Sequence, residues 1–260
     1  MTTSLPILTF HDLSPSRDLL SLPPARFERI LTTLVNAGWQ CWPLLRLAQR
    51  LHDGLSLPSR TFCLTFDDGY RSVHQVALPI LRELNLTATV FALVGQRLAD
   101  PDGVASYRGR PLLTWSELRE LAEAGCSIGA HTITHRNLAR LSPSQALDEA
   151  LQSRGVLSDR IGLAEAEIRA FAFPGGRAST AACQALEPFF ACACTDELAL
   201  VTAHSRPMAL PRIDTYYLRH PRLAALLPGR WFEPYIRTIS IPRRLRRSIS
   251  DLVGDGVIRV

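Results

Sequence analysis

The chain has 260 residues, of which 47% are hydrophobic and 20% are charged, and its formal net charge is +5. This ordinary globular composition is long enough for one large core. No apolar run approaches the roughly 20 residues that cross a bilayer, and the N-terminus lacks the basic and apolar regions of a signal peptide. We therefore expect a cytoplasmic protein and leave association with a membrane surface open.

The sequence context of the basic residues argues against a nucleic-acid-binding protein, and that of the cysteines argues against a disulfide-linked or cysteine-metal protein. All 29 basic residues are arginine, but no helix-turn-helix, RNA-binding aromatic signature or zinc-finger spacing accompanies them, so we expect no nucleic-acid partner. None of the six cysteines forms a CxxC pair, and Cys63 and Cys126 lie in apolar strand-like runs. We expect these thiols to be buried as small hydrophobic groups rather than paired in disulfides or bound to a metal.

The first half of the chain alternates short apolar runs with amphipathic stretches. The apolar, β-rich runs predict strands over 6–10, 60–66 and 87–94. Apolar residues at three- and four-residue steps predict helices over 24–38, 43–54 and 76–85. Pro79 falls inside the last of these helices, where it suits a first turn or a kink.

The same alternation continues to the end of the second half. Amphipathic stretches predict helices over 114–125, 142–162 and 179–189, the second with Ser142 as N-cap and Pro143 in its first turn. Apolar runs predict strands over 126–131, 168–174, 190–195 and 208–214. We therefore predict a (β/α) barrel of about seven parallel strands, closed or nearly closed, with an open doubly wound sheet as the alternative.

Unusual polar residues fall where the predicted strands end, which is where a parallel barrel carries its chemistry. They are His11, Asp67, Asp68, His131, the segment Pro174–Gly176, Arg212 and Asp214. His135 follows His131 by four residues, so the two imidazoles share one face if the segment is helical. Together with Asp68 they make two histidines and one carboxylate, a set typical of an open catalytic zinc site.

The adjacent carboxylates Asp67 and Asp68 need different roles, because successive strand residues point in different directions. A divalent cation offsets the charge on Asp68. Asp67 is then left beside a metal-bound water, where it can act as general base. Gly69 allows the sharp turn that follows.

These motifs resemble the polysaccharide deacetylases, also called NodB-homology or carbohydrate esterase family 4 proteins. "TFDDGY" (65–70), "HTITH" (131–135) and "FAFPGG" (171–176) are similar to three motifs of that family and occur in the family order. The resemblance implies a distorted (β/α) barrel over residues 1–220, followed by a basic helical extension over 221–260. It also implies metal-dependent removal of an N- or O-acetyl group from a sugar, with Asp67 as base and a metal-bound water as nucleophile. The implied metal ligands are Asp68, His131 and His135.

The sequence departs from the family pattern at two positions, so other residues have to supply the general acid and the arginine that orients the base. The usual arginine of the third motif is replaced by Ala172, and the late leucine-x-histidine motif that supplies the usual acid has no clear match. "TFHD" and "LPRID" instead resemble the branch that contains poly-N-acetylglucosamine deacetylases. On that resemblance His11 is the general acid, with His204 as the alternative, and Arg212 orients Asp67.

Substrate contacts are expected from the glycine turn and an aromatic residue. We expect a backbone N–H near Gly175, within the segment formed by Pro174, Gly175 and Gly176, to stabilise the oxyanion. Tyr70 and Tyr107 are candidates to stack on sugar rings. The arginine-rich run 243–247 suggests weak contact with anionic lipid, although a solvated helix is the plainer interpretation.

The function predicted from the sequence is that of a metal-dependent deacetylase. Its substrate would be an acylated sugar, an oligosaccharide or a lipid-linked sugar, and its cofactor Zn²⁺, with Co²⁺, Ni²⁺ or Fe²⁺ as alternatives. A deformylase or other linear-amide hydrolase is the alternative enzyme. A catalytically silent carbohydrate-binding protein is the alternative of another class. The sequence leaves the oligomeric state open.

Overall fold

The computed structural model describes residues 4–16, 18–99, 105–219, 226–227, 229 and 231–241. The arginine-rich run 243–247 lies outside these residues, as does most of the predicted extension 221–260. Of that extension, residues 232–241 form a helix. No helix in the described part of the chain is both long enough and apolar enough to cross a membrane.

One curled parallel sheet forms the centre of the molecule. Its strand order is β10-β9-β8-β5-β4-β2-β12, and β3 also pairs with β4. The bounds are β2 Ile7–Phe10, β3 Gln40–Cys41, β4 Thr61–Phe66, β5 Thr89–Ala92, β8 Ser127–Ala130, β9 Ala170–Ala172, β10 Cys192–Cys194 and β12 Ile213–Asp214. Apart from the position of β12, the order follows the chain in one direction without the reversal of a doubly wound sheet. The predicted distorted barrel of seven parallel strands is confirmed.

The two edges of the sheet come close to closing the barrel. The Leu210 N–H donates to the Ala193 carbonyl at 2.8 Å, and the Thr195 N–H donates to the Leu210 carbonyl at 2.9 Å. Leu210 thus bridges the end of β10 to the segment that leads into β12. The predicted strand over 208–214 is wrong in its first half, where Pro207–Ala209 forms a 3-10 turn (η5). Prolines at 207 and 211 lack the N–H that a longer ladder needs.

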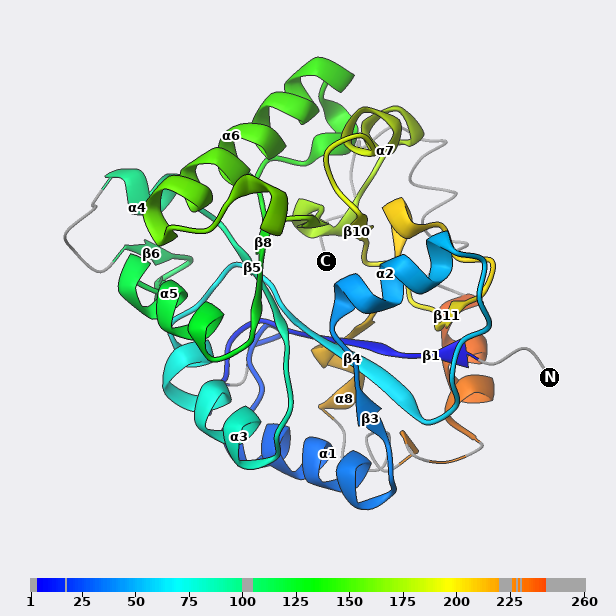
Figure 1. Cartoon of the computed structure of the whole chain (residues 1–260). Coiled ribbons are helices and arrows are strands. Elements are labelled where there is room, and N and C mark those ends of the chain that lie inside the picture. The colour runs from blue at the N-terminus through cyan, green and yellow to red at the C-terminus, as the bar shows by residue number, and fades with distance from the viewer. Residues whose placement is uncertain are drawn as a thin grey trace.

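Helices surround the sheet, and α1, α3, α5 and α6 lie in an arc around its outside in Figure 1. The bounds are α1 Pro24–Asn36, α2 Leu44–His52, α3 Leu78–Glu83, α4 Gly95–Ala99, α5 Trp115–Glu123, α6 Pro143–Ile161, α7 Thr180–Leu186 and α8 Thr215–Leu218. Capping boxes fix the N-termini of α5 and α6. Thr114 and Glu117 form a capping box at α5, and Ser142 and Gln145 form one at α6.

Several short elements complete the chain. They are β1 Ser4–Leu5 paired antiparallel with β11 Val201–Thr202, the β6–β7 hairpin (Ser106–Tyr107 and Arg110–Pro111), and the 3-10 turns η2 Leu138–Arg140, η3 Glu165–Glu167 and η4 Pro174–Gly176. A π-helical turn, η1 Val73–Ala77, precedes α3. It lies just before Pro79, which cannot donate a helical hydrogen bond, so the predicted helix over 76–85 is divided there.

Both faces of the sheet are covered. Every residue of β4 is buried. Leu64 and Phe66 belong to the large core beneath the helices, whereas Cys63 belongs to a separate cluster on the opposite face. All six cysteines are free and five are buried, as predicted. Burial raises the pKa of the Cys63 and Cys192 thiols, which keeps them neutral.

Candidate active site

The polar residues at the strand ends meet at one end of the sheet. His11 follows β2, Asp67 and Asp68 follow β4, and His131 follows β8. Because neighbouring parallel strands end at the same edge, residues far apart in the chain converge here. Arg212, just before β12, reaches the same place from the other side of β2.

Asp68, His131 and His135 form one compact cluster. The Oδ1 atom of Asp68 lies 3.4 Å from Nε2 of His131 and 3.2 Å from Nε2 of His135. One ligand atom from each of the three residues lies within 4.8 Å of the other two. Asp68 is 3% exposed and His131 is 1% exposed, so the cluster is closed on its inner side.

Hydrogen bonds on the far side of each ring orient the imidazoles. Nδ1 of His131 lies 2.8 Å from the Ala172 carbonyl oxygen, and because a carbonyl only accepts, this nitrogen carries the proton. Nδ1 of His135 lies 3.0 Å from the Tyr107 hydroxyl oxygen, which can accept a hydrogen bond from it in the same way. In this tautomer each Nε2 atom, close to the Asp68 carboxylate, can offer its lone pair to a cation bound between the three side chains. Three converging lone pairs are what a cation binds, so these residues fit a divalent metal of the zinc type.

The charge environment of the cluster agrees with that fit. Burial alone would raise the pKa of Asp68, but the His131 and His135 imidazoles beside it hold that pKa well below its usual range. Burial opposes a charge on His131, but the carboxylates of Asp68 and Asp67 raise its pKa above the ordinary value. The cluster therefore attracts positive charge.

The segment that carries the two histidines is a loop, so the helical turn expected between them is wrong. Its backbone is left-handed at Thr132, with φ +70°, and at His135, with φ +59°. The two rings nevertheless meet, with centroids 5.1 Å apart. Spacing by four residues is therefore not the cause of their convergence.

Glu149 of α6 holds this loop in place. Its carboxylate accepts hydrogen bonds from the N–H groups of Ile133 and Thr134, both at 3.0 Å, and from the Thr134 hydroxyl. The His135 N–H donates to the Thr132 hydroxyl oxygen at 3.0 Å. Glu149 lies in the middle of an amphipathic helix, and nothing in its sequence context marks it as a site residue.

Asp67 is held by Arg212 rather than by the metal cluster. Nη1 and Nη2 of Arg212 each donate to one carboxylate oxygen of Asp67 at 2.7 Å, and Arg212 also donates to the Thr195 carbonyl and the Thr65 hydroxyl. Asp67 is 4% exposed and Arg212 is 5% exposed. Burial would raise the pKa of Asp67, but the Arg212 guanidinium more than offsets this and lowers it. The carboxylate is therefore ionised and fixed in direction.

His11 lies on the other side of Asp67. Its Nε2 atom is 3.9 Å from Oδ2 of Asp67, too far for a hydrogen bond but within reach of an ion pair. Its Nδ1 atom is buried and has no hydrogen-bond partner in the described part of the chain. The imidazole thus stands beside the ionised carboxylate with neither ring nitrogen bound by the fold.

The family model of the polysaccharide deacetylases matches residues 55–189, which contain Asp67, Asp68 and both histidines. The chain belongs to the polysaccharide deacetylase family. The matched range excludes His11 and Arg212, so their place in the deacetylase site rests on the geometry above.

Curated relatives give the same family. The chain is 31% identical over 150 residues to YxkH of Bacillus subtilis (strain 168), which is named as a putative polysaccharide deacetylase. The match covers 58% of this chain and 50% of that protein. It is 26% identical over 129 residues to the poly-beta-1,6-N-acetyl-D-glucosamine N-deacetylase of Escherichia coli (strain K12), covering 47% of this chain and 19% of that protein. The matches thus span half or less of the length of these relatives.

Solved structures share the fold. IcaB from Ammonifex degensii is 21% identical, with a TM-score of 0.75 over 87% of this chain and 98% of that one. The Streptococcus pyogenes deacetylase PplD, solved in complex with acetate, is 23% identical, with a TM-score of 0.71 over 82% of this chain and 93% of that one. At these identities the likeness shows the fold alone.

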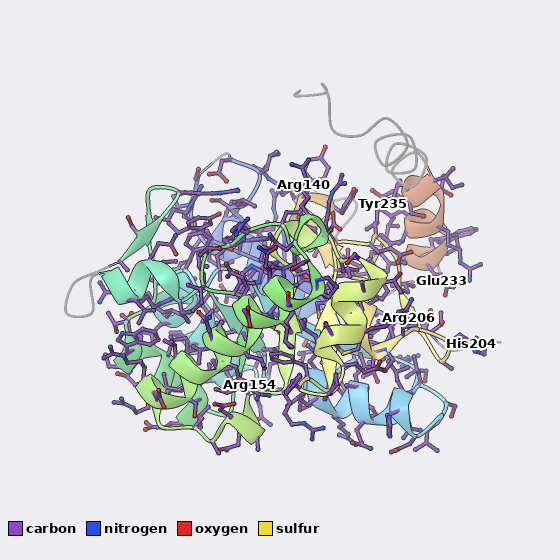
Figure 2. The ribbon with its side chains drawn as sticks, turned by 90° about the horizontal axis from the view of Figure 1, so that it is seen from above. Arg140, Arg154, His204, Arg206, Glu233 and Tyr235 are labelled. Atoms are coloured by element: carbon purple, nitrogen blue, oxygen red, sulfur yellow. The ribbon has the colours of Figure 1, made fainter. Side chains whose placement is uncertain are left out.

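Two predicted residues are not part of the cluster. His204, the alternative acid, is exposed on a loop after β11 and lies at the periphery of the molecule (Figure 2). Tyr70 is 0% exposed, so it has no open ring face for stacking on a sugar, and that expectation is corrected. Burial and the nearby Asp68 carboxylate raise the pKa of Tyr70 and keep its hydroxyl neutral.

The glycine turn after β9 divides into an exposed and a buried part. Gly175 is exposed, whereas Pro174 and Gly176 are buried. The Gly176 N–H donates to the Phe173 carbonyl at 2.8 Å. A Cβ atom on Gly176 would lie 2.1 Å from Cβ of Asp196, so only glycine fits there. Of the three residues, Gly175 is thus the one whose N–H remains a candidate for the substrate oxyanion.

Proposed function

We propose that this polysaccharide deacetylase removes an acetyl group from an N-acetylated sugar or polysaccharide in a metal-dependent hydrolysis. The observation that carries the proposal is the buried cluster of Asp68, His131 and His135, with the separately held carboxylate of Asp67 beside it. The name of the Escherichia coli relative supports polymers of N-acetylglucosamine as the first substrates to test.

A divalent ion held by Asp68, His131 and His135, zinc being the first candidate, would supply the Lewis acidity that activates water and polarises an acyl carbonyl. The remaining chemistry falls to the chain. Asp67 accepts the proton of the attacking water, because its carboxylate is ionised and both oxygens have a fixed direction through Arg212. The exposed turn at Gly175 offers a backbone N–H to the oxyanion that forms.

His11 is the proposed general acid. The departing amine needs a proton, and Nε2 of His11 lies 3.9 Å from Asp67, while its Nδ1 atom has no hydrogen-bond partner among the described residues. Asp67 therefore faces the water and His11 faces the leaving group. A base that takes a proton from the attacking water and an acid that gives one to the leaving nitrogen match general acid–base hydrolysis of an amide.

The deciding experiment measures metal content together with acetate release from N-acetylglucosamine oligomers, with and without a chelator. About one metal per chain and chelator-sensitive acetate release support the proposal. Metal without acetate release keeps the site and points to lipid-linked or formylated substrates, which is the deformylase alternative. A protein that binds no added zinc, cobalt, nickel or iron overturns the proposal and favours the sugar-binding alternative.

A further inference from the structure

Arg97 of α4 is a buried cation that the proposed chemistry does not use. It is 2% exposed. Its Nε atom donates to the Leu113 carbonyl at 2.7 Å and its Nη2 atom donates to the Gly69 carbonyl at 2.8 Å. Nη1 is buried without a hydrogen-bond partner in the described part of the chain. An arginine buried in this way costs free energy, so the contacts it makes need a reason.

The Gly69 carbonyl belongs to the turn that aims Asp68 at the histidines. Asp68 and Gly69 have φ values of +64° and +70°, two successive left-handed residues. This conformation is unfavourable for aspartate, so the turn needs support from outside itself. A Cβ atom on Gly69 would lie 2.8 Å from Nη2 of Arg97, which shows how closely the guanidinium packs on the turn.

The residues just before Arg97 also hold the histidine loop. The Leu93 N–H donates to the Asp68 carbonyl at 3.4 Å, and the Val94 N–H donates to the Thr132 carbonyl at 3.4 Å. The Gly95 N–H donates to the Ile133 carbonyl at 3.0 Å. The segment 93–97 therefore contacts both loops that carry the proposed metal ligands, and Arg97 is its one side chain bonded to the Asp68 turn among the described residues.

We infer that Arg97 is a positioning residue of the metal site, which keeps Asp68 in register with His131 and His135 through its bond to the Gly69 carbonyl. The inference rests on the proposed function, because it concerns the same site. Nε and Nη2 reach two carbonyls in a fixed fork. Lysine has a single nitrogen on a flexible stem and cannot reproduce that fork.

The test compares Co²⁺ binding by the chelator-stripped wild-type protein with binding by Arg97→Met, Arg97→Lys and a control, Leu121→Ala. Leu121 is 0% exposed in α5 and belongs to the same core, so its truncation lowers stability without touching either ligand loop. Affinity is measured against a competing chelator, and the visible absorption of bound Co²⁺ reports the ligand geometry. Thermal unfolding of the metal-free proteins is recorded alongside.

We expect Arg97→Met to weaken Co²⁺ binding by about 10-fold or more and to change the absorption spectrum, with Arg97→Lys in between. Leu121→Ala should unfold at a lower temperature yet keep the affinity and spectrum of the wild type. If the Arg97 variants also keep the wild-type Co²⁺ affinity and absorption spectrum, the residue is merely structural and the inference is wrong. If Arg97→Met does not fold, the Co²⁺ affinity and spectrum of Arg97→Lys decide whether the inference holds. If the wild-type protein itself binds no Co²⁺, the proposed function is wrong together with the inference. If only the role of Arg97 is wrong, the wild type still binds Co²⁺, so the two failures can be told apart.

Discussion

Replacing Arg212 with methionine removes the only cation bonded to Asp67 among the described residues. Two contacts of 2.7 Å are lost, and the Asp67 carboxylate stays buried at 4% exposure. Methionine keeps the apolar length of the side chain, so the change concerns charge more than packing. Breaking a buried ion pair from one side costs about 3–5 kcal/mol, because the other charge is left without compensation.

Loss of Arg212 should also raise the pKa of Asp67, because Arg212 stabilises the ionised carboxylate. In the wild type the pKa is lowered, so the ion pair contributes stability above the unfolded value of about 3.9, which is lost as pH falls through the folded pKa. In Arg212→Met burial still raises the pKa of Asp67, and the lowering by Arg212 is lost while that by His131 and His11 remains, so the pKa rises. The variant should therefore be least stable, relative to the wild type, at neutral pH. The difference should shrink as pH falls through the raised pKa of the variant, because protonation neutralises its buried Asp67.

The assay is the pH profile of kcat/KM, with urea unfolding at about pH 4 and pH 7. The acid limb should move to higher pH, because the pKa of Asp67 rises when Arg212 is lost. Arg154→Met is the control, because it removes an arginine of α6 (Figure 2) that pairs with Glu165 at 2.7 Å and also donates to the Phe189 carbonyl. It should leave the acid limb unchanged. An unmoved acid limb in a folded, active Arg212→Met would refute the reasoning, since Arg212 would then not set the protonation of Asp67.

Three further variants test separate parts of the structure. Asp67→Asn should lower kcat by about 10²–10⁴ and leave the metal content unchanged; loss of metal would contradict the separation of base and ligand. His11→Ala should lower kcat by about 10² or more with its metal retained, whereas near-normal activity would remove His11 as the acid. Ser142→Ala removes the capping box of α6 and should lower the free energy of unfolding by about 1 kcal/mol in urea at unchanged kcat; an unchanged urea midpoint would show that the cap contributes nothing.

The sequence by itself determined most helices and strands of the barrel and which side chains are candidate metal ligands. Apolar runs predicted every strand of the central sheet except the two-residue β3, and the N-cap at Ser142 marked a helix start that the structure retains. These signals are local, because a strand or a cap involves residues within a few positions of each other. Polar residues after apolar runs stood out for the same reason, which is how Asp68 and His131 could be recognised.

The tertiary structure alone decided how those residues are held. The pair formed by Asp67 and Arg212 joins positions 145 apart, and Glu149 reaches the histidine loop from a different element. The loop itself is left-handed at two residues instead of helical, and Tyr70 is buried where an exposed ring was expected. Such contacts depend on strand order and on the path of each loop. No short stretch of sequence encodes them, because they form only when the whole sheet has closed around its core.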